Sequence, residues 1–429
     1  VAGRIGAAPR RAVLEVVGGQ SPQHLVTEFA ATIAAGGAEV VLLFGSEAIS
    51  TARHLAGAEG RPDFTEHADG DLEDRGYALD GLFPPHAADH GITGAPEMYA
   101  LFENARRARL GLPRAEYDRA MGELFAPFTR VAARNPHAAA PVERDAHELV
   151  TPTAANRPIA DPYPRYLVSR DQVNQGAAVL LTSVGAARRL GVPEERWVFL
   201  HGHADLRERD PMDRADLGGY PAAVLASRHA LEVAGVGVDD VATFDLYSCF
   251  PVAVSTVADG LGLAADDPRG LTLTGGLPFF GGAGNNYSMH AIAETVQRAR
   301  SAPGTHGFVG ANGGMLSKYS AGVYATTPVA WRPDRSRDLQ AQVDGWPAPP
   351  RAERADGTGT VETWTVKHGR SGERTGIVVG RLADGRRFLA RTDDGDDELV
   401  ELLATGEPFG QPVRVRSTDR GNRVGVGGA

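Results

Sequence analysis

The chain has 429 residues, of which 42% are apolar and 23% are charged, a composition typical of a globular protein with two to three domains. Its formal net charge of −10 argues against nucleic acid as the main partner. No apolar run reaches the length of a membrane helix, and the single cysteine, Cys249, excludes an internal disulfide framework and a cysteine-rich zinc site. We therefore expect a cytoplasmic protein.

Residues 1–50 have the pattern of a parallel strand–helix–strand unit. The first strand is predicted over residues 12–17 and ends at a pair of glycines. Ser21 followed by Pro22 is typical of an N-cap, and the helix that begins there ends before Gly36. The apolar run 39–44 predicts a second buried strand, parallel to the first.

Residues 51–170 form a long insertion with two helical patterns, at 95–110 and 114–135. Long insertions into α/β sheets often cover a ligand, so we expect a covering loop domain. Residues 171–190 return to the N-terminal half, with a strand predicted at 175–182.

Residues 191–331 predict a second series of alternating strands and helices. Strands are expected at 197–200, 241–246, 271–274, 306–309 and 322–325, and helices at 220–234, 251–261 and 287–300. Two glycine-rich stretches, 275–290 and 307–322, supply the turns. Glycine at this density lets the backbone approach a ligand closely, and N–H groups turned outward can bind negative charge.

The last hundred residues have a different texture. Residues 332–358 are rich in Pro, Arg, Asp and Gly and predict a linker. Residues 359–429 alternate with a period of two and predict five or so short strands with one helix at 396–404, an OB-like barrel. Such barrels can bind single-stranded nucleic acid, but eleven basic and eleven acidic residues at 361–424, with Trp364 as the one Trp, favour a packing or acyl-carrier role.

The motifs VVGGQSPQHL, DLYSCF, TGGLPFFGGAGNNY and GANGGM, in this order along the chain, resemble the turns of the thiolase superfamily. The resemblance is closest to sterol-carrier-protein-type thiolases and to thiolase-like proteins with an added C-terminal OB-like domain. It implies a thiolase-like layered α-β-α-β-α fold with a covering loop domain and a small C-terminal β-barrel. It also implies further strands ahead of residue 12, in the centre of the first sheet.

The resemblance places the family's Cys, His and Cys residues at Gly19, Gly282 and Gly310 of this chain. Claisen chemistry needs a thiolate to hold the acyl group and a base to remove the α-proton. The resemblance therefore implies a protein of the acetyl-CoA acetyltransferase type, linked to lipid metabolism, that keeps the scaffold for a coenzyme A thioester. Classical acyltransferase activity is not expected of it.

Three polar residues are catalytic candidates. Tyr247 takes the position of the family's asparagine or histidine in the motif after the strand. Cys249 is either a thiol activated at a helix start or a small buried residue. Asn312, in the last glycine loop, is a candidate hydrogen-bond donor.

Three further residues are candidates for binding the thioester. Asn285 and Asn286 either donate hydrogen bonds to its carbonyl or cap the next helix. Lys318 either contacts a phosphate or carboxylate or is a solvated loop lysine.

Other polar residues carry less weight. Ser21 as a substitute nucleophile is disfavoured against its interpretation as an N-cap, and His290 is interpreted as packed or solvated. The sequence His201-Gly202-His203-Ala204-Asp205 looks metal-like, but no further ligand follows at a defined spacing, and His86 and His90 are weaker still. We predict no metal.

Three functions stay open at this point. The first is a thiolase-like protein that binds acyl-CoA or an acyl-carrier thioester. The second is a non-catalytic binding module, with a possible protein partner on the OB-like domain. The third is a retro-aldol lyase acting on coenzyme A thioesters, with Tyr247 as the base.

Overall fold

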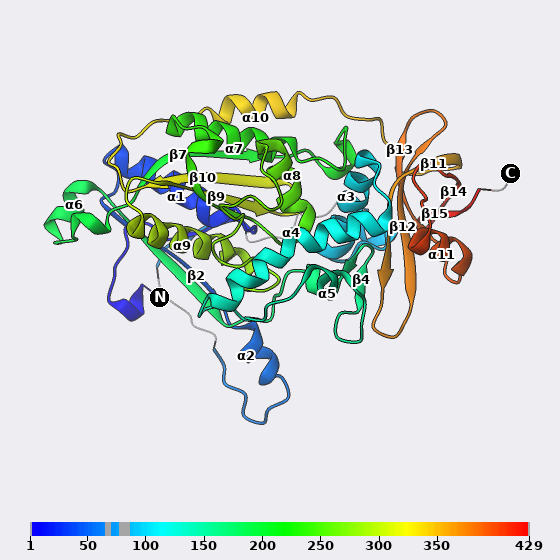
Figure 1. Ribbon diagram of the computed structural model, residues 1–429, viewed down its shortest axis with the longest axis horizontal. Coiled ribbons are helices and arrows are strands. Elements are labelled where there is room, and N and C mark those ends of the chain that lie inside the picture. Colours follow the sequence, from blue (N-terminus) through cyan, green and yellow to red (C-terminus); the bar gives the residue numbers. More distant parts are fainter. Residues whose placement is uncertain (1, 65–69, 77–85, 428–429) are drawn as a thin grey trace.

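The computed structural model describes residues 2–64, 70–76 and 86–427, and it places a layered α/β core at one end and a β-barrel at the other (Figure 1). The strands of the central sheet are β7 (Phe199–Arg207), β8 (Val241–Leu246), β9 (His306–Gly313) and β10 (Lys318–Ala325). Their order is β7-β10-β9-β8; β8 and β9 are parallel, and β10 is antiparallel to both of its neighbours.

Helices cover both faces of this sheet. α7 (Pro221–Ala234) and α8 (Pro251–Leu261) lie on one face, and α1 (Ser21–Ala34) and α9 (Tyr287–Ser301) lie on the other. Alternate residues of β10 pack against the two helix layers. Val323 packs in the core that contains α7 and α8, whereas Tyr324 packs with α1 and α9. The apolar alternation of the strand thus joins two separate helix layers.

An antiparallel ribbon of β2 (Val40–Glu47) and β6 (Gln175–Thr182) covers the far side of α1 and α9. Its inner face contributes Leu43 to the core. Its outer face is apolar as well, with Phe44 50% exposed and Leu180 57% exposed. Both faces of these strands are therefore apolar, as the continuous hydrophobic runs in the sequence indicate.

The predicted parallel unit over residues 12–48 is wrong in its pairing. β1 (Val13–Leu14) has only two residues and pairs in parallel with β3 (Glu73–Asp74), whereas β2 pairs antiparallel with β6. Apolar runs indicate a strand but not its partner, and here each partner comes from a segment more than fifty residues away in the chain.

The covering segment packs against the core and the barrel together. It contains the long helices α3 (Ala95–Leu110) and α4 (Arg114–Arg134), which agree with the sequence patterns. α3 contacts α8 on one side and the barrel on the other. The shorter elements between the ribbon strands are α2 (Ile49–His54), α5 (Ala146–Val150), β4 (Pro158–Ala160) and β5 (Tyr163–Pro164).

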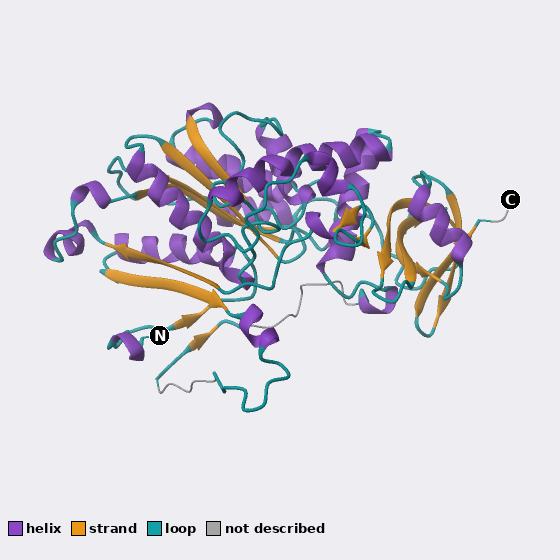
Figure 2. Cartoon of the chain, turned by 60° about the horizontal axis from the view of Figure 1, so that its bottom comes forward, coloured by secondary structure: helices purple, strands orange, loops and turns teal. Residues whose placement is uncertain are grey.

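The C-terminal residues form a closed five-stranded barrel, which Figure 2 shows at one end of the molecule. Its elements are β11 (Gly357–His368), β12 (Arg374–Leu382), β13 (Arg387–Thr392), α11 (Asp397–Thr405), β14 (Pro412–Thr418) and β15 (Gly421–Val426). The order β11-β12-β13-β15-β14 closes back onto β11, and the helix follows the third strand, as in an OB fold. Trp364 is fully buried in the barrel's own core.

Several local predictions need correction. Residues 271–274 are not a strand, because four of their donors, among them the N–H groups of Leu273 and Thr274, bond to the buried carboxylate of Asp245 instead of to a neighbouring strand. The predicted linker contains α10 (Ser336–Asp344), which packs on β7 and α7. α6 (Val184–Arg189) was not anticipated.

Asp118 on α4 gives the covering segment a pH-dependent stability. One of its carboxylate oxygens is buried and has no hydrogen-bond partner among the described residues. Burial raises the pKa of Asp118 to about 6, although the positive charge of Arg114 lowers it. An acid whose pKa is higher in the folded state loses stability as the pH rises through that value. We expect Asp118→Asn to raise the free energy of unfolding by about 1–3 kcal/mol at pH 8, with the gain shrinking toward pH 5.

Urea unfolding at both pH values measures this effect. Glu123→Gln is the matched control, because Glu123 is on the same helix, exposed, and paired with Arg119. A loss of stability in Asp118→Asn that is equal at the two pH values would contradict the argument.

Candidate functional site

The turn after β1 and the turn after β8 meet the end of β9 in the interior. A Cβ atom on Gly19 would lie 2.2 Å from the Tyr247 hydroxyl oxygen and 2.6 Å from the Asn312 carbonyl oxygen. Real Cβ atoms do not approach other heavy atoms so closely, so residue 19 must be glycine while Tyr247 keeps this position. The structure therefore brings Gly19, Tyr247 and Asn312 together, and the phenol of Tyr247 fills the space that a side chain at residue 19 would need.

The space beside a second glycine, Gly310, is filled in the same way. A Cβ atom on Gly310 would lie 2.0 Å from the hydroxyl oxygen of Tyr319 on the adjacent strand. Gly282 is different, since the nearest atoms to its Cβ would be a methyl carbon of Leu277 at 3.2 Å and the Arg170 carbonyl oxygen at 3.3 Å. The spaces beside two of the three glycines are thus occupied by tyrosine hydroxyls, and the space beside the third is tight but not filled by a tyrosine.

Asn312 and Cys249 lie in a buried tyrosine cluster. The Asn312 amide nitrogen donates to the Tyr99 hydroxyl at 2.8 Å and lies 3.8 Å from the Cys249 sulfur, and its amide oxygen accepts from the Tyr220 hydroxyl at 3.1 Å. Burial raises the pKa of the Cys249 thiol to about 12. This environment therefore disfavours the thiolate form of Cys249, and a thiolate is the reactive form of a cysteine nucleophile.

Tyr99 and Tyr220 were missed by sequence reasoning. Tyr99 is on α3 in the covering segment, and Tyr220 precedes α7, so each lies far in sequence from Asn312. A lone tyrosine at the start of a helix is typical of a core residue, and no local pattern distinguishes these two.

The three predicted thioester-binding side chains all bond to main chain near the first turn and the ribbon. Asn285 accepts from the Gly18 N–H at 2.9 Å, Asn286 donates to the Gly45 carbonyl at 2.6 Å, and the Lys318 ammonium donates to the Val17 carbonyl at 2.8 Å. They join the N-terminal turn and ribbon to the C-terminal half. Their role toward a thioester stays a prediction.

Two cap predictions are wrong. Asn286 is the residue before α9 but makes no side-chain cap hydrogen bond, because its amide reaches the ribbon. Ser21 is the first helical residue and not the N-cap, and its hydroxyl donates to the Val16 carbonyl at 2.7 Å. The Ser–Pro pair predicts the helix start to within one residue, but the hydroxyl bonds backward along the chain.

The histidines have protein partners or apolar neighbours. His201 and His203 lie within β7 and not after a strand; they bond to the Thr327 carbonyl and to Asp334, and His203 stacks on Trp331. His290 packs edge-on against Phe280, and burial lowers its pKa to about 4.

The histidines of the covering segment are also engaged. His90 receives a hydrogen bond from the Asn422 N–H at 2.8 Å, and the His86 ring packs edge-on against the His90 ring. These rings fasten the segment to the barrel.

One group of metal-like residues was not anticipated. Ligand atoms of Glu15, His24 and Glu28 lie within 4.8 Å of one another. The Arg75 guanidinium donates to both carboxylates at 2.6 Å. Since a guanidinium already neutralises the two acids, we interpret this group as an ion-pair network.

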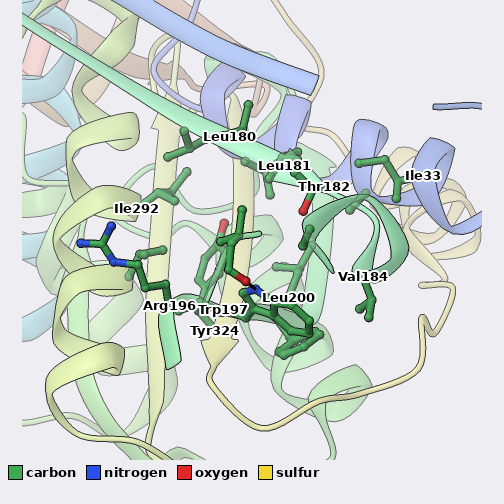
Figure 3. Close-up of a pocket in the computed structure, with 18 of the residues that line it drawn as sticks. Ile33, Leu180, Leu181, Thr182, Val184, Arg196, Trp197, Leu200, Ile292 and Tyr324 are labelled. Carbon is green, nitrogen blue, oxygen red and sulfur yellow. Dashed lines mark hydrogen bonds between the residues drawn. The ribbon is translucent and has the colours of Figure 1, made fainter. Parts of the chain in front are cut away.

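Among the described residues, two of the cavities beside the core bear on the site. One, of about 570 Å³, lies between α1, α9, β6 and β7, is largely apolar and contains none of the predicted site residues (Figure 3). The other, of about 110 Å³, is lined by Arg144, Arg165 and Arg170 beside residues 278–279 of the glycine-rich loop. Arg170 joins this cavity to the Gly282 turn, because its carbonyl accepts from the Gly282 N–H at 2.8 Å.

Arg144, Arg165 and Arg170 line the smaller cavity together with one acid, Asp171, so its lining carries a net positive charge. Arg144 pairs with Glu148, but the Nε atom of Arg170 is buried and has no hydrogen-bond partner among the described residues. Burial and the nearby Arg165 and Arg144 lower the pKa of Arg170. An anion bound here would satisfy the buried donor and relieve the repulsion.

The layered core, the glycine turns that meet inside it and the C-terminal barrel define a thiolase-like protein with an additional domain. A family profile described as the "thiolase-like protein type 1 additional C-terminal domain" matches residues 338–420. The crystal structure of a monomeric SCP2-thiolase-like protein type 1 from Mycobacterium smegmatis is 54% identical with a TM-score of 0.88, over 99% of this chain and 86% of that chain. The chain belongs to the SCP2-thiolase-like proteins of type 1.

A more distant structure shows the fold alone. The Ltp2–ChsH2(DUF35) aldolase is 18% identical with a TM-score of 0.53, over 72% of this chain and 78% of that chain. No curated protein sequence matches the chain. The family resemblance, the thiolase-like α/β fold and the C-terminal barrel predicted from the sequence are confirmed. Within the described ranges, no helix combines the length and the apolarity that crossing a membrane requires.

Proposed function

We propose that the protein binds a coenzyme A thioester, or a related acyl-carrier thioester, and does not transfer its acyl group. The observation that carries this proposal is the occupation of the Gly19 position by the Tyr247 phenol. A covalent acyl-enzyme needs a nucleophile, and loss of the nucleophile leaves only binding and oxyanion stabilisation. A thiolase scaffold with that position filled is suited to holding a thioester.

The arginine cavity supports phosphate binding on the same side as the Gly282 turn. Arg144, Arg165 and Arg170 present guanidinium groups, which suit the phosphates of coenzyme A. The pantetheine arm would then run toward the Gly282 turn, where the space beside the glycine is less filled than at Gly19 or Gly310.

Thermal unfolding with coenzyme A, acetyl-CoA and acetoacetyl-CoA at millimolar concentration tests the proposal. We expect each ligand to raise the melting temperature, and Arg170→Ala to remove most of the rise. Arg130→Ala is the control, because Arg130 is an exposed residue of α4 outside the cavity. Acetoacetyl-CoA mixed with coenzyme A should give no thiolysis; a melting temperature unmoved by all three ligands, or measurable turnover, would overturn the proposal.

A retro-aldol lyase is the second candidate. It is favoured by the hydroxyl of Tyr247, for which no hydrogen-bond partner is found among the described residues, and by the fold shared with a protein named as an aldolase. Burial raises the pKa of Tyr247, so its phenol would be a proton donor at neutral pH and not the base predicted from sequence. Release of an aldehyde or ketone from β-hydroxyacyl-CoA would favour this candidate.

A further inference from the structure

The C-terminal barrel has an arginine-lined cavity of about 470 Å³ that the proposed function does not use. It opens between the loop that joins β11 to β12 and the turn that joins β14 to β15, over strands β12 and β13. OB folds bind their ligands on this face, between these two loops. Residues 88–93 of the covering segment form the opposite wall.

Arg423 is the unusual residue of this cavity. It is only 6% exposed, and its two hydrogen bonds, at 2.9 and 3.0 Å, go to the main-chain carbonyls of Arg420 and Asn422. Arg387, the other buried arginine of the barrel, forms an ion pair with Glu362. Among the described residues Arg423 has no carboxylate partner, although a buried charge is normally paired.

The register of the paired strands places a second positive charge beside Arg423. β13 and β15 are parallel, and Arg391 lies directly opposite Arg423 in the register. Like charges directly opposite each other on neighbouring strands are destabilising. Arg391 bonds to Asp394, whose side chain is 84% exposed, so solvent weakens that compensation. Burial, and then the charge of Arg391, lower the pKa of Arg423.

The other residues that line the cavity indicate which kind of ligand would neutralise the positive charge of Arg423 and Arg391. Arg420 adds a further cation, Lys367 is already paired with Glu97 at 3.0 Å, and Asp89 and Glu373 are the acids of the wall. No aromatic side chain lines the cavity within the described part of the chain. OB folds that bind single strands depend on stacking of bases on aromatic rings, whereas guanidinium groups alone suit phosphate. The volume is that of a small-molecule site.

We propose that the barrel binds a phosphorylated small molecule in this cavity, with a phosphate between Arg391, Arg420 and Arg423. Because residues 88–93 and the barrel share the site, the ligand also joins the covering segment to the barrel. This site is separate from the arginine cavity beside the Gly282 turn and does not depend on the proposed thioester function.

Calorimetric titration of the whole chain with inorganic pyrophosphate at low ionic strength tests this site. We expect one equivalent to bind, with an affinity that falls as salt is added. The double variant Arg391→Gln, Arg420→Gln should bind about tenfold more weakly or worse. Arg386→Gln, on the β12–β13 turn and paired with Asp384 outside the cavity, should bind like the parent. Arg423→Met should abolish pyrophosphate binding. If that variant does not fold, the double variant Arg391→Gln, Arg420→Gln tests the site.

Two further titrations identify the source of the phosphate. Coenzyme A that competes with pyrophosphate in the Arg170→Ala protein would place a nucleotide phosphate in the barrel, whereas pyrophosphate binding without that competition would indicate a smaller ligand. No heat of binding with pyrophosphate at millimolar concentration would overturn the proposal. Equal affinity of pyrophosphate for the parent and the double variant would also overturn it, because that result shows an adventitious anion only. Tight binding of a single-stranded oligonucleotide that pyrophosphate does not displace would overturn it as well.

Discussion

Replacing Gly19 by alanine should destabilise the protein by roughly 2–4 kcal/mol, the range for forcing atoms into a packed interior. The added Cβ would lie 2.2 Å from the Tyr247 hydroxyl and 2.6 Å from a main-chain oxygen of Asn312, which cannot rotate away. Urea unfolding followed by circular dichroism measures the change. Gly282→Ala is the matched control, since its nearest contacts of 3.2 and 3.3 Å need only a small shift, and it should cost about 1 kcal/mol or less.

A double-mutant cycle shows whether Tyr247 is the cause. Tyr247→Asn alone should cost about 3–5 kcal/mol, because it removes a buried ring. Combined with Gly19→Ala it should cost less than the sum by about 1–3 kcal/mol, since the ring and the new Cβ compete for one space. Strict additivity, or a Gly19→Ala protein as stable as Gly282→Ala, would show that the phenol does not fill the space beside residue 19.

Replacing Glu103 by alanine should cost about 4 kcal/mol or more, because three buried donors lose their acceptor. The carboxylate of Glu103 is fully buried on α3 and accepts from the Tyr117 and Tyr163 hydroxyls and, at 2.7 Å, from the Val252 N–H at the start of α8. It therefore joins two helices and a strand of the covering segment to the helix that follows Cys249. Loss of this joint should loosen the covering segment.

Native-state hydrogen exchange and urea unfolding measure the Glu103 effect. Tyr163→Phe removes one of the three bonds and should cost about 1–2 kcal/mol. Glu103→Ala and Tyr163→Phe together should cost little more than Glu103→Ala alone, because the Tyr163 bond is already lost. If Glu103→Ala costs no more than Tyr163→Phe, Glu103 is not the centre of the joint.

The order of elements was largely determined by local pattern. The helices α3 and α8 and the strand β6 have the bounds that periodicity and helix-stop signals indicate. The motif positions of the glycines at residues 19, 282 and 310 could be predicted from the sequence, because the order of motifs along the chain does not depend on folding. The family and the barrel followed from the same kind of information.

The tertiary structure decided what surrounds those glycines. Nothing local shows that Tyr247 fills the place beside Gly19, that Tyr319 fills the place beside Gly310, or that Arg423 is buried opposite Arg391. The first contact joins segments far apart in the chain, and the other two depend on which strands pair and in which register. Packing density at such a contact depends on the backbone path and not on residue type. The sequence by itself therefore determined that residues 19, 282 and 310 are glycines at turns, and only the folded chain decided that tyrosine hydroxyls lie against two of them.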